Sequence, residues 1–177
     1  MVPTQSGEYL VLTVALFAIA VVFRILYRLW RRPRARRHRY HIRQARRVID
    51  RIESIPNPAQ RMAYLRKIDP LTFEELLLEA AKRRGYRIHR NKRYSGDGGV
   101  DGRIESNGRV FLIQAKRYSG HVNRQDVADF RKLVEQSGCY GMFCHTGRTG
   151  AATREVGKTD RVTILSGESL LRFIDTA

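Results

Sequence analysis

The pattern of hydrophobic and polar positions changes three times along this chain. Residues 9–30 are largely apolar, with Arg24 and Arg28 as the charged interruptions near the end of the run. In residues 36–55 apolar side chains recur every three or four positions, which predicts an amphipathic helix. Beyond Asp69, short apolar runs alternate with helical periodicity, which predicts a domain of mixed strands and helices.

The first stretch predicts a transmembrane helix at residues 9–30 behind a short extracytoplasmic tail at 1–8. As a helix it would be about 33 Å long, enough to cross a bilayer core of about 30 Å. A cleaved signal peptide and a buried helix of a globular protein are the alternatives. Arginine makes up nine of the 17 residues in 31–47, which places that side in the cytoplasm by the positive-inside rule. We therefore expect a single-pass protein of the bacterial inner (plasma) membrane, with its C-terminal domain in the cytoplasm.

Residues 31–68 are predicted to form an arginine-rich helical stalk. Pro56-Asn57-Pro58 breaks its helix, and residues 59–68 form a second short helical piece. The basic residues from Arg31 to Arg47 can contact anionic lipids or nucleic-acid phosphates, and the two roles are compatible. The chain carries 34 Lys and Arg against 17 Asp and Glu, a formal charge of +17, which favours a polyanionic partner.

Residues 69–177 are predicted to form one globular domain. Asp69 and Pro70 open a helix, and Gly85 ends it. Asn107-Gly108 is a strong signal for a type I′ turn and predicts a β-hairpin. The remaining elements are predicted as a strand at 86–93, hairpin strands at 100–105 and 109–117, a helix at 126–135, a strand at 140–145, a helix at 150–158, a strand at 161–165 and a helix at 168–174. The order α-β-β-β-α-β-α-β-α implies an α/β fold, a mixed sheet flanked by helices.

The hairpin also carries the candidate chemistry. Gln114 and Lys116 are two residues apart on a predicted strand, so their side chains project from the same face. Asp101 lies near the same end of the hairpin. A carboxylate, an amide oxygen and an ammonium group are the parts needed to hold a divalent metal and polarise a water molecule.

These residues resemble the Mrr-type restriction endonuclease domain, which belongs to the PD-(D/E)XK nuclease superfamily. The resemblance is carried by Phe73-Glu74 opening a helix, Gly85-Tyr86 ending it, the run DGGVDG at 97–102, and Gln114-Ala115-Lys116 in a core strand. It covers about residues 71–174 and implies a restriction-endonuclease-like fold. Each match alone is weak, but four matches in order on the expected elements are much more specific.

The resemblance implies a role for each matching residue. Asp101 would bind the metal, and Gln114 would fill the second ligand position with the Ala115 backbone carbonyl nearby. Lys116 would orient or deprotonate the attacking water. The expected cofactor is Mg²⁺ or Mn²⁺. Because Gln contributes no negative charge, we expect modest metal affinity before substrate joins the site.

Two further groups of residues near the expected metal site have less specific roles. Glu74 is expected to complete the metal site or its surroundings, with Glu75 as the alternative. Basic residues expected to contact DNA are Lys92, Arg93, Arg117 and Arg124.

The function expected from the sequence is a membrane-anchored, divalent-metal-dependent DNA endonuclease, similar to type IV restriction enzymes. It would act in restriction and defence or in DNA processing at the membrane. A non-catalytic nucleic-acid-binding module tethered to the membrane and an interaction scaffold are the alternatives, and RNA stays open as a substrate. Cutting both DNA strands with one site per chain favours a homodimer.

Overall fold

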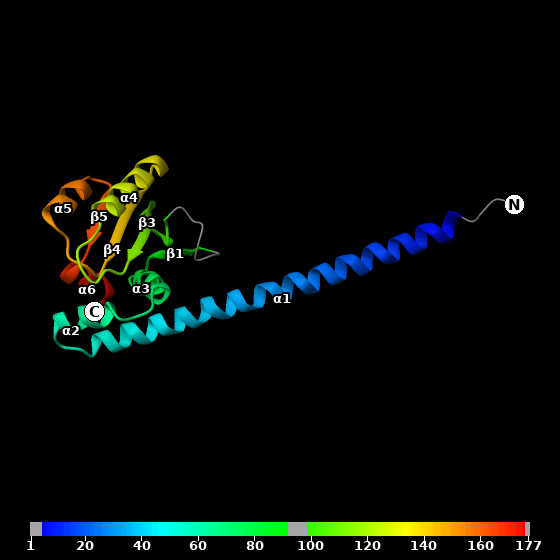
Figure 1. Ribbon diagram of the computed structural model, residues 1–177, viewed down its shortest axis with the longest axis horizontal. Helices are drawn as coiled ribbons and strands as arrows, with labels where there is room; N and C mark the ends of the chain where they lie inside the picture. Colours follow the sequence, from blue (N-terminus) through cyan, green and yellow to red (C-terminus); the bar gives the residue numbers. More distant parts are fainter. Residues whose placement is uncertain (1–4, 92–98, 176–177) are drawn as a thin grey trace. The chain divides into compact units, whose positions relative to one another are not determined.

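The computed structural model describes residues 5–91 and 99–175, with the backbone alone for 5–8, 10 and 28–35. The chain divides into two compact units, residues 1–40 and 41–177. The helices of the described part are α1 (Gln5–Glu53), α2 (Pro58–Leu65), α3 (Pro70–Arg83), α4 (Arg124–Ser137), α5 (Ala151–Gly157) and α6 (Gly167–Ile174) (Figure 1). The strands are β1 (Arg87–Arg90), β2 (Gly102–Ser106), β3 (Arg109–Lys116), β4 (Tyr140–His145) and β5 (Val162–Leu165).

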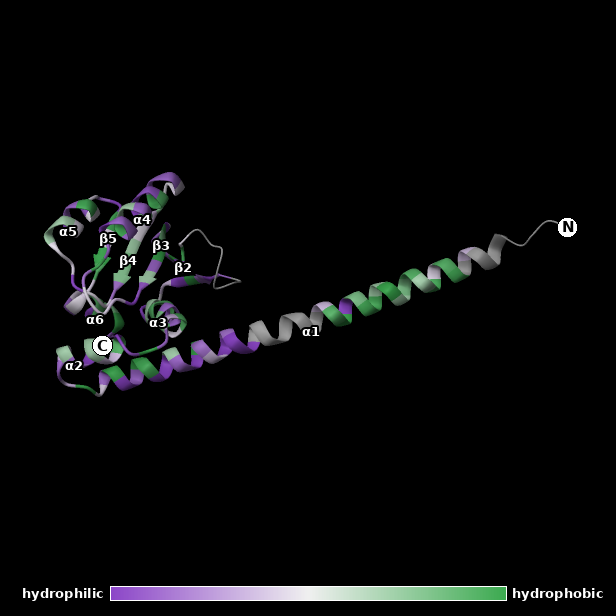
Figure 2. Cartoon of the chain, in the orientation of Figure 1, coloured by the Kyte–Doolittle hydropathy of each residue, from purple (hydrophilic) through white to green (hydrophobic). Residues whose placement is uncertain are grey.

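Helix α1 is continuous across residues 30 and 31, where the sequence separates a membrane span from a stalk. Its large apolar side chains between Tyr9 and Tyr27 are 40–73% exposed and form the apolar part of the helix in Figure 2. Across the residues that the structure describes, no helix combines the length and the apolar character needed to cross a membrane. The transmembrane helix predicted at residues 9–30 is therefore not supported.

The five strands form one mixed sheet in the order β1-β2-β3-β4-β5. The pairs β1–β2 and β2–β3 are antiparallel, whereas β3–β4 and β4–β5 are parallel and joined through helices. Asn107 and Gly108 both have positive φ, 49° and 73°, and join Ser106 to its partner Arg109. The mixed sheet and the hairpin turn predicted from the sequence are thus confirmed.

Helices cover both faces of this sheet and bury two apolar cores. Helices α4 and α5 lie on one face, where Phe130 and Val134 pack with Phe143 of β4. Helices α3 and α6 lie on the other, where Leu77 and Leu170 belong to the core that contains Ile104, Ile113 and Leu165 of the sheet. Since strand side chains alternate between faces, Gln114 and Lys116 share the face of Phe143.

The C-terminal part of α1 and the whole of α2 belong to the globular unit. Ala45, Ile49, Ile52 and Leu65 are fully buried in the same core as α3. The compact unit begins at His41, whereas the sequence pattern places the start of the domain at residue 69. The apolar stripe that predicts an amphipathic helix in 36–55 is what packs into this core.

Short capping interactions set the connection from α2 to α3. The Asn57 side chain accepts hydrogen bonds from the first turn of α2, where Pro58 occupies the first position. The Asp69 carboxylate accepts the backbone N–H of Thr72 at 3.1 Å, with Pro70 opening α3. The helix start predicted at Asp69 and Pro70 is confirmed, and it fixes where Glu74 lies on the second turn of α3.

Candidate active site

Asp101 lies where β2 and β3 separate. Its backbone N–H donates to the Ile113 carbonyl at 2.8 Å, which continues the antiparallel pairing by one residue beyond Gly102. The Asp101 carboxylate then accepts the backbone N–H of Ala115 at 2.7 Å. The Asp101 side chain thus takes the place of the next backbone-to-backbone hydrogen bond between the two strands. The carboxylate is held against β3 at Ala115, between Gln114 and Lys116.

Gln114 lies in the middle of this arrangement with its side chain buried. The residue is 8% exposed, and its side-chain oxygen Oε1 has no hydrogen-bond partner in the described part of the protein. A buried acceptor without a partner is costly, so this oxygen is available to accept from a water molecule or to bind a cation. Gly99 has φ of +89°, and a Cβ there would lie 2.9 Å from the Gln114 amide nitrogen. Glycine at 99 therefore lets the backbone pass close to this amide.

Glu74 projects from α3 into the same region. The pKa of its carboxyl is raised to about 8, mainly by burial and then by the nearby negative charge of Asp101, while the charge of Lys116 opposes both effects. Two carboxyl groups and an ammonium group are therefore close enough to interact electrostatically. A site in which two acids repel each other is one that a cation would stabilise.

Glu75, the alternative to Glu74, lies elsewhere. Its carboxylate receives a hydrogen bond from Arg90 Nε at 2.8 Å, and its side chain is 2% exposed. Arg90 also bonds Glu79, which in turn accepts Arg46 Nε of α1 at 2.7 Å. Glu75 belongs to a buried ion network that joins β1, α3 and α1, whereas Glu74 faces Asp101 and Lys116.

Lys116 ends β3 and is half-buried. It pairs in register with His145, the last residue of β4. His145 is fully buried, and this burial lowers its pKa to about 4, so the imidazole is neutral at physiological pH. Its Nε2 shares a hydrogen bond with the Thr149 hydroxyl at 3.0 Å. His145 is therefore a neutral neighbour of Lys116.

The donor set fits a hard divalent cation. In the described residues, no three His, Cys, Asp or Glu side chains group together as a metal site. The candidate oxygen donors are of mixed kinds: the carboxyl groups of Asp101 and Glu74, the amide oxygen of Gln114 and the Ala115 carbonyl. Mg²⁺ and Mn²⁺ bind such oxygen ligands and retain water molecules, so few protein ligands are needed.

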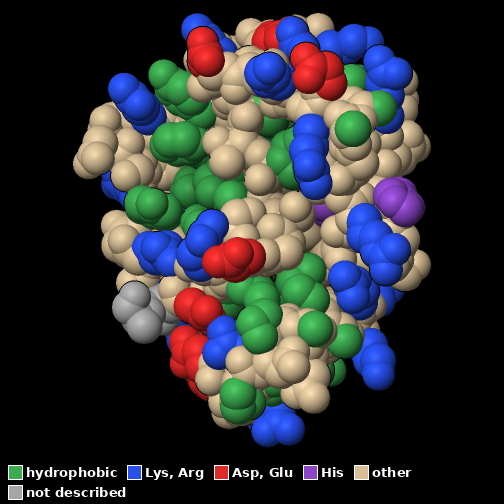
Figure 3. Space-filling view, turned by 90° about the vertical axis from the view of Figure 1, so that its left-hand side faces the viewer, with side chains coloured by type: hydrophobic (Ala, Val, Ile, Leu, Met, Phe, Trp, Pro, Cys, Tyr) green, Lys and Arg blue, Asp and Glu red, His purple; other side chains and the backbone are tan. Residues whose placement is uncertain are grey.

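The residues expected to contact DNA are only partly covered by the structure. Lys92 and Arg93 lie outside the described residues. Arg117 follows Lys116 and is exposed, and its Nη1 donates to the Arg66 carbonyl at 2.6 Å. Arg124 is exposed at the first turn of α4. Figure 3 shows Lys and Arg side chains along the right-hand side of the viewed face, with a histidine among them.

Arg148 is a further basic residue, near the C-terminal ends of β3 and β4, and it was not among the residues expected to contact DNA. It is exposed in the loop after β4, and its backbone exchanges hydrogen bonds with Gly120 and Val122 in the loop after β3. The two loops therefore run side by side beyond the C-terminal ends of β3 and β4. An isolated loop arginine carries no sequence signal, because only the pairing of two distant loops brings it here.

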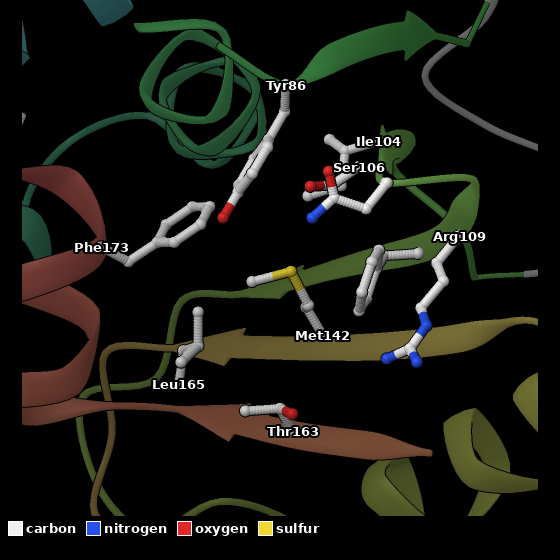
Figure 4. A pocket seen from close by; sticks show the side chains of 10 residues that line it. Tyr86, Ile104, Ser106, Arg109, Met142, Thr163, Leu165 and Phe173 are labelled. Carbon is white, nitrogen blue, oxygen red and sulfur yellow. The ribbon is translucent and has the colours of Figure 1, made fainter. Parts of the chain in front are cut away.

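A separate cavity of about 460 Å³ contains none of these residues (Figure 4). Tyr86, Met142 and Phe173 are among the side chains that point into it, as Figure 4 shows. Phe111 of β3 and Leu165 of β5 are also among the residues that line it. Phe111 projects from the face of β3 opposite to that of Gln114 and Lys116, so the cavity is separate from the candidate chemistry.

Comparisons with known proteins point to one group of enzymes. The sequence model of the restriction endonuclease family Mrr_cat matches residues 65–174. The type IV methyl-directed restriction enzyme EcoKMrr of Escherichia coli (strain K12) is 30% identical over 119 residues, which cover 62% of this chain and 39% of the relative. The chain therefore spans well under half the length of that enzyme. The solved structure of the MspJI restriction endonuclease in complex with a 27-mer oligonucleotide aligns with a TM-score of 0.49 and 27% identity, over 66% of this chain and 30% of that one.

Proposed function

The chain belongs to the restriction endonuclease family Mrr_cat, and we propose that it is a divalent-metal-dependent DNA endonuclease that hydrolyses phosphodiester bonds. The observation that carries the proposal is the bond from Ala115 N–H to the Asp101 carboxylate, which holds that acid on the strand bearing Gln114 and Lys116. Glu74 adds a second acid beside Asp101. These groups come from α3, β3 and the residue before β2, so the fold rather than the local sequence assembles them.

The residues divide the chemistry among themselves. Asp101, the Gln114 amide oxygen and the Ala115 carbonyl are suited to hold Mg²⁺ or Mn²⁺, with Glu74 completing the site. When bound, such an ion supplies a Lewis acid for a non-bridging phosphate oxygen. As an ammonium group, Lys116 would orient the attacking water and stabilise negative charge that develops on the phosphate; as a neutral amine it would accept the proton of that water and become the ammonium group. Arg117 and Arg124 are exposed basic residues, and we expect them to contact flanking phosphates.

The proposal is tested by cleavage of duplex DNA with the full-length chain in Mg²⁺ or Mn²⁺. We expect the wild type to cut, and Lys116→Met to bind DNA without cutting. Lys132→Met, which removes an exposed lysine of α4, is the matched control and should cut normally. A wild type that binds DNA but cuts with neither metal would instead support the non-catalytic binding module.

The substrate class can be narrowed by the same assay. The Escherichia coli relative is named as methyl-directed, and we propose methylated duplex DNA as the preferred substrate, as in a type IV enzyme. Matched methylated and unmethylated plasmids provide the comparison, and a single-stranded RNA of equal length tests the RNA alternative. Equal cutting of both plasmids would remove the type IV assignment and leave the nuclease activity intact.

The location at the inner membrane is a separate proposal. The exposed apolar side chains between Tyr9 and Tyr27, followed by the arginine-rich run, support attachment of the N-terminal unit to a lipid surface. This location is tested by fractionation of cells that express either the full-length chain or its Phe17→Asp, Ile19→Asp double variant. We expect the wild type to remain with membranes after a high-salt wash and the variant to be released.

A further inference from the structure

Four hydrogen bonds form a closed circuit around the end of β3. Arg66 Nε donates to the Thr146 carbonyl at 2.9 Å, and the Thr146 backbone N–H donates to the Lys116 carbonyl at 3.3 Å. The Thr146 hydroxyl donates to the Tyr118 carbonyl at 2.8 Å. Arg117 Nη1 closes the circuit by donating to the Arg66 carbonyl at 2.6 Å. We refer to these five residues as the Arg66 circuit.

The Arg66 circuit fixes the peptide units that follow Lys116 and Tyr118. Thr146 is fully buried and binds two carbonyls of the neighbouring chain segment, those of Lys116 and Tyr118. A strand end held by one parallel neighbour alone would be free to fray. The added hydroxyl bond and the Arg66 guanidinium restrict it, so the backbone that carries Lys116 has a defined position.

Arg66 also lies next to the helix that supplies Glu74. It is the C-cap of α2, and Asp69, the N-cap of α3, follows three residues later. Its side chain forms no ion pair with any described residue. Instead, its Nε donates a hydrogen bond to the backbone carbonyl of Thr146. One residue thus connects the α2–α3 link, which leads to Glu74, with the strand end that carries Lys116.

We propose that Arg66 is a positioning residue for phosphodiester hydrolysis: it holds the Lys116 end of β3 at a fixed distance from the α3 helix that carries Glu74. The inference rests on the nuclease function proposed above. Catalytic groups must be held within about 0.5 Å of their productive geometry by the residues that support them. In the described part of the chain, the hydrogen bonds of the Arg66 side chain and carbonyl involve the Thr146 carbonyl and the Arg117 side chain and neither the candidate metal donors nor the Lys116 ammonium group, so it acts through the backbone.

The test uses the full-length chain and separates the rate of cleavage from DNA affinity. In Arg66→Met we expect the single-turnover rate at saturating DNA and metal to fall about 10- to 100-fold, the range typical of supporting residues. The dissociation constant for DNA should stay at the wild-type value. Arg66→Lys keeps one donor toward the Thr146 carbonyl and should recover part of the rate.

Two further variants distinguish a loss of positioning from a loss of folding. Thr146→Val keeps the shape and the backbone bonds and removes only the hydroxyl bond to Tyr118, so we expect a smaller loss of rate in the same direction. Arg61→Met is the matched control: Arg61 also lies on α2 but binds the Ile55 carbonyl and Asp175, away from β3. It should lower thermal stability and leave the rate at saturation unchanged.

The outcomes are distinguishable. If the wild type cuts and Arg66→Met cuts equally fast, the positioning role is overturned while the nuclease function stands. If Arg66→Met weakens DNA binding but cuts normally at saturation, Arg66 is a DNA contact and the inference is also overturned. A wild type that does not cut under either metal overturns both proposals.

Discussion

The Asp101 carboxylate accepts the Ala115 backbone N–H at 2.7 Å, in the place where a strand neighbour would otherwise supply a carbonyl. This single bond gives the acid two roles. It completes the hydrogen bonding of β3 after β2 has diverged, and it aims a negative charge at the space between Gln114 and Lys116. The two roles can be separated experimentally because asparagine keeps the acceptor and loses the charge.

Asp101→Asn and Asp101→Ala are therefore expected to differ in stability and to agree in activity. Asp101→Ala leaves the Ala115 N–H without its partner and should lower the free energy of unfolding by about 1–3 kcal/mol. Asp101→Asn should unfold close to the wild type. Both should lose DNA cleavage, because both lose the metal-binding charge. Urea unfolding and a Mg²⁺-dependent cleavage assay provide the measurements, and an active Asp101→Asn would show that the acid is only structural.

Glu74 gives the metal-free protein a pH-dependent stability. Its pKa is about 8 in the folded chain against an ordinary value of 4.5, so between these values the folded state binds more protons than the unfolded state. The free energy of unfolding should fall as the pH rises through this window and become level above about pH 8. Glu74→Gln should remove this contribution.

The measurement is chemical unfolding of wild type and Glu74→Gln from pH 5 to 9 in the presence of EDTA. The difference between the two curves isolates the contribution of Glu74 from that of other titrating groups. A difference that does not change with pH would mean that the Glu74 carboxyl ionises normally and lies apart from Asp101.

Among the partly exposed residues, Arg90 is expected to be the one whose replacement lowers the free energy of unfolding most. Its partners Glu75 and Glu79 have side chains that are only 2% and 5% exposed. Arg90→Ala would remove the counter-charge that these two buried carboxylates share, and the free energy of unfolding should fall by about 3–5 kcal/mol. Arg172→Ala breaks an ion pair whose side chains are 70% and 78% exposed, and it should cost less than about 1 kcal/mol. Similar losses in the two variants would contradict the buried network.

The C-terminal part of α1 should behave as core rather than as a tether. Ile49 is fully buried with α3, so Ile49→Ala should lower the free energy of unfolding of the globular unit by about 2–5 kcal/mol. Ile25 belongs to the other unit and is 51% exposed, and Ile25→Ala should leave that transition unchanged. For the same reason, a chain that begins at residue 68 should not fold normally. A stable, cooperative fragment from residue 68 onward would show that α1 is dispensable.

Local sequence signals predicted most of the sheet. Asn107-Gly108 determines the turn because both residues tolerate positive φ, and the turn then sets the register that pairs Gly102 with Ile113. Strand β4 lies at 140–145, as its apolar run predicts. Within the described residues the first strand runs from Arg87 to Arg90, inside the predicted range 86–93, whose last two positions lie outside the described part. Strand ends depend on neighbours that a local pattern does not contain.

The boundary of the globular unit was harder to predict. An amphipathic helix in 36–55 is visible from its period, but the period does not say which surface covers the apolar stripe. The structure shows the stripe buried on α3, with Arg46 bonded to Glu79 beside it. A stalk and a core helix have the same sequence pattern and differ only in their packing partner.

The sequence by itself determined the order of the elements, the hairpin and the shared face of Gln114 and Lys116, because these follow from turn chemistry and from the two-residue period of a strand. The tertiary structure brings Glu74 within electrostatic range of Asp101, pairs Glu75 with Arg90, and carries Arg66 to Thr146 across 80 positions of sequence. Adjacent glutamates on a helix point in directions about 100° apart, so only the packing of α3 against the sheet gives the two side chains different neighbours.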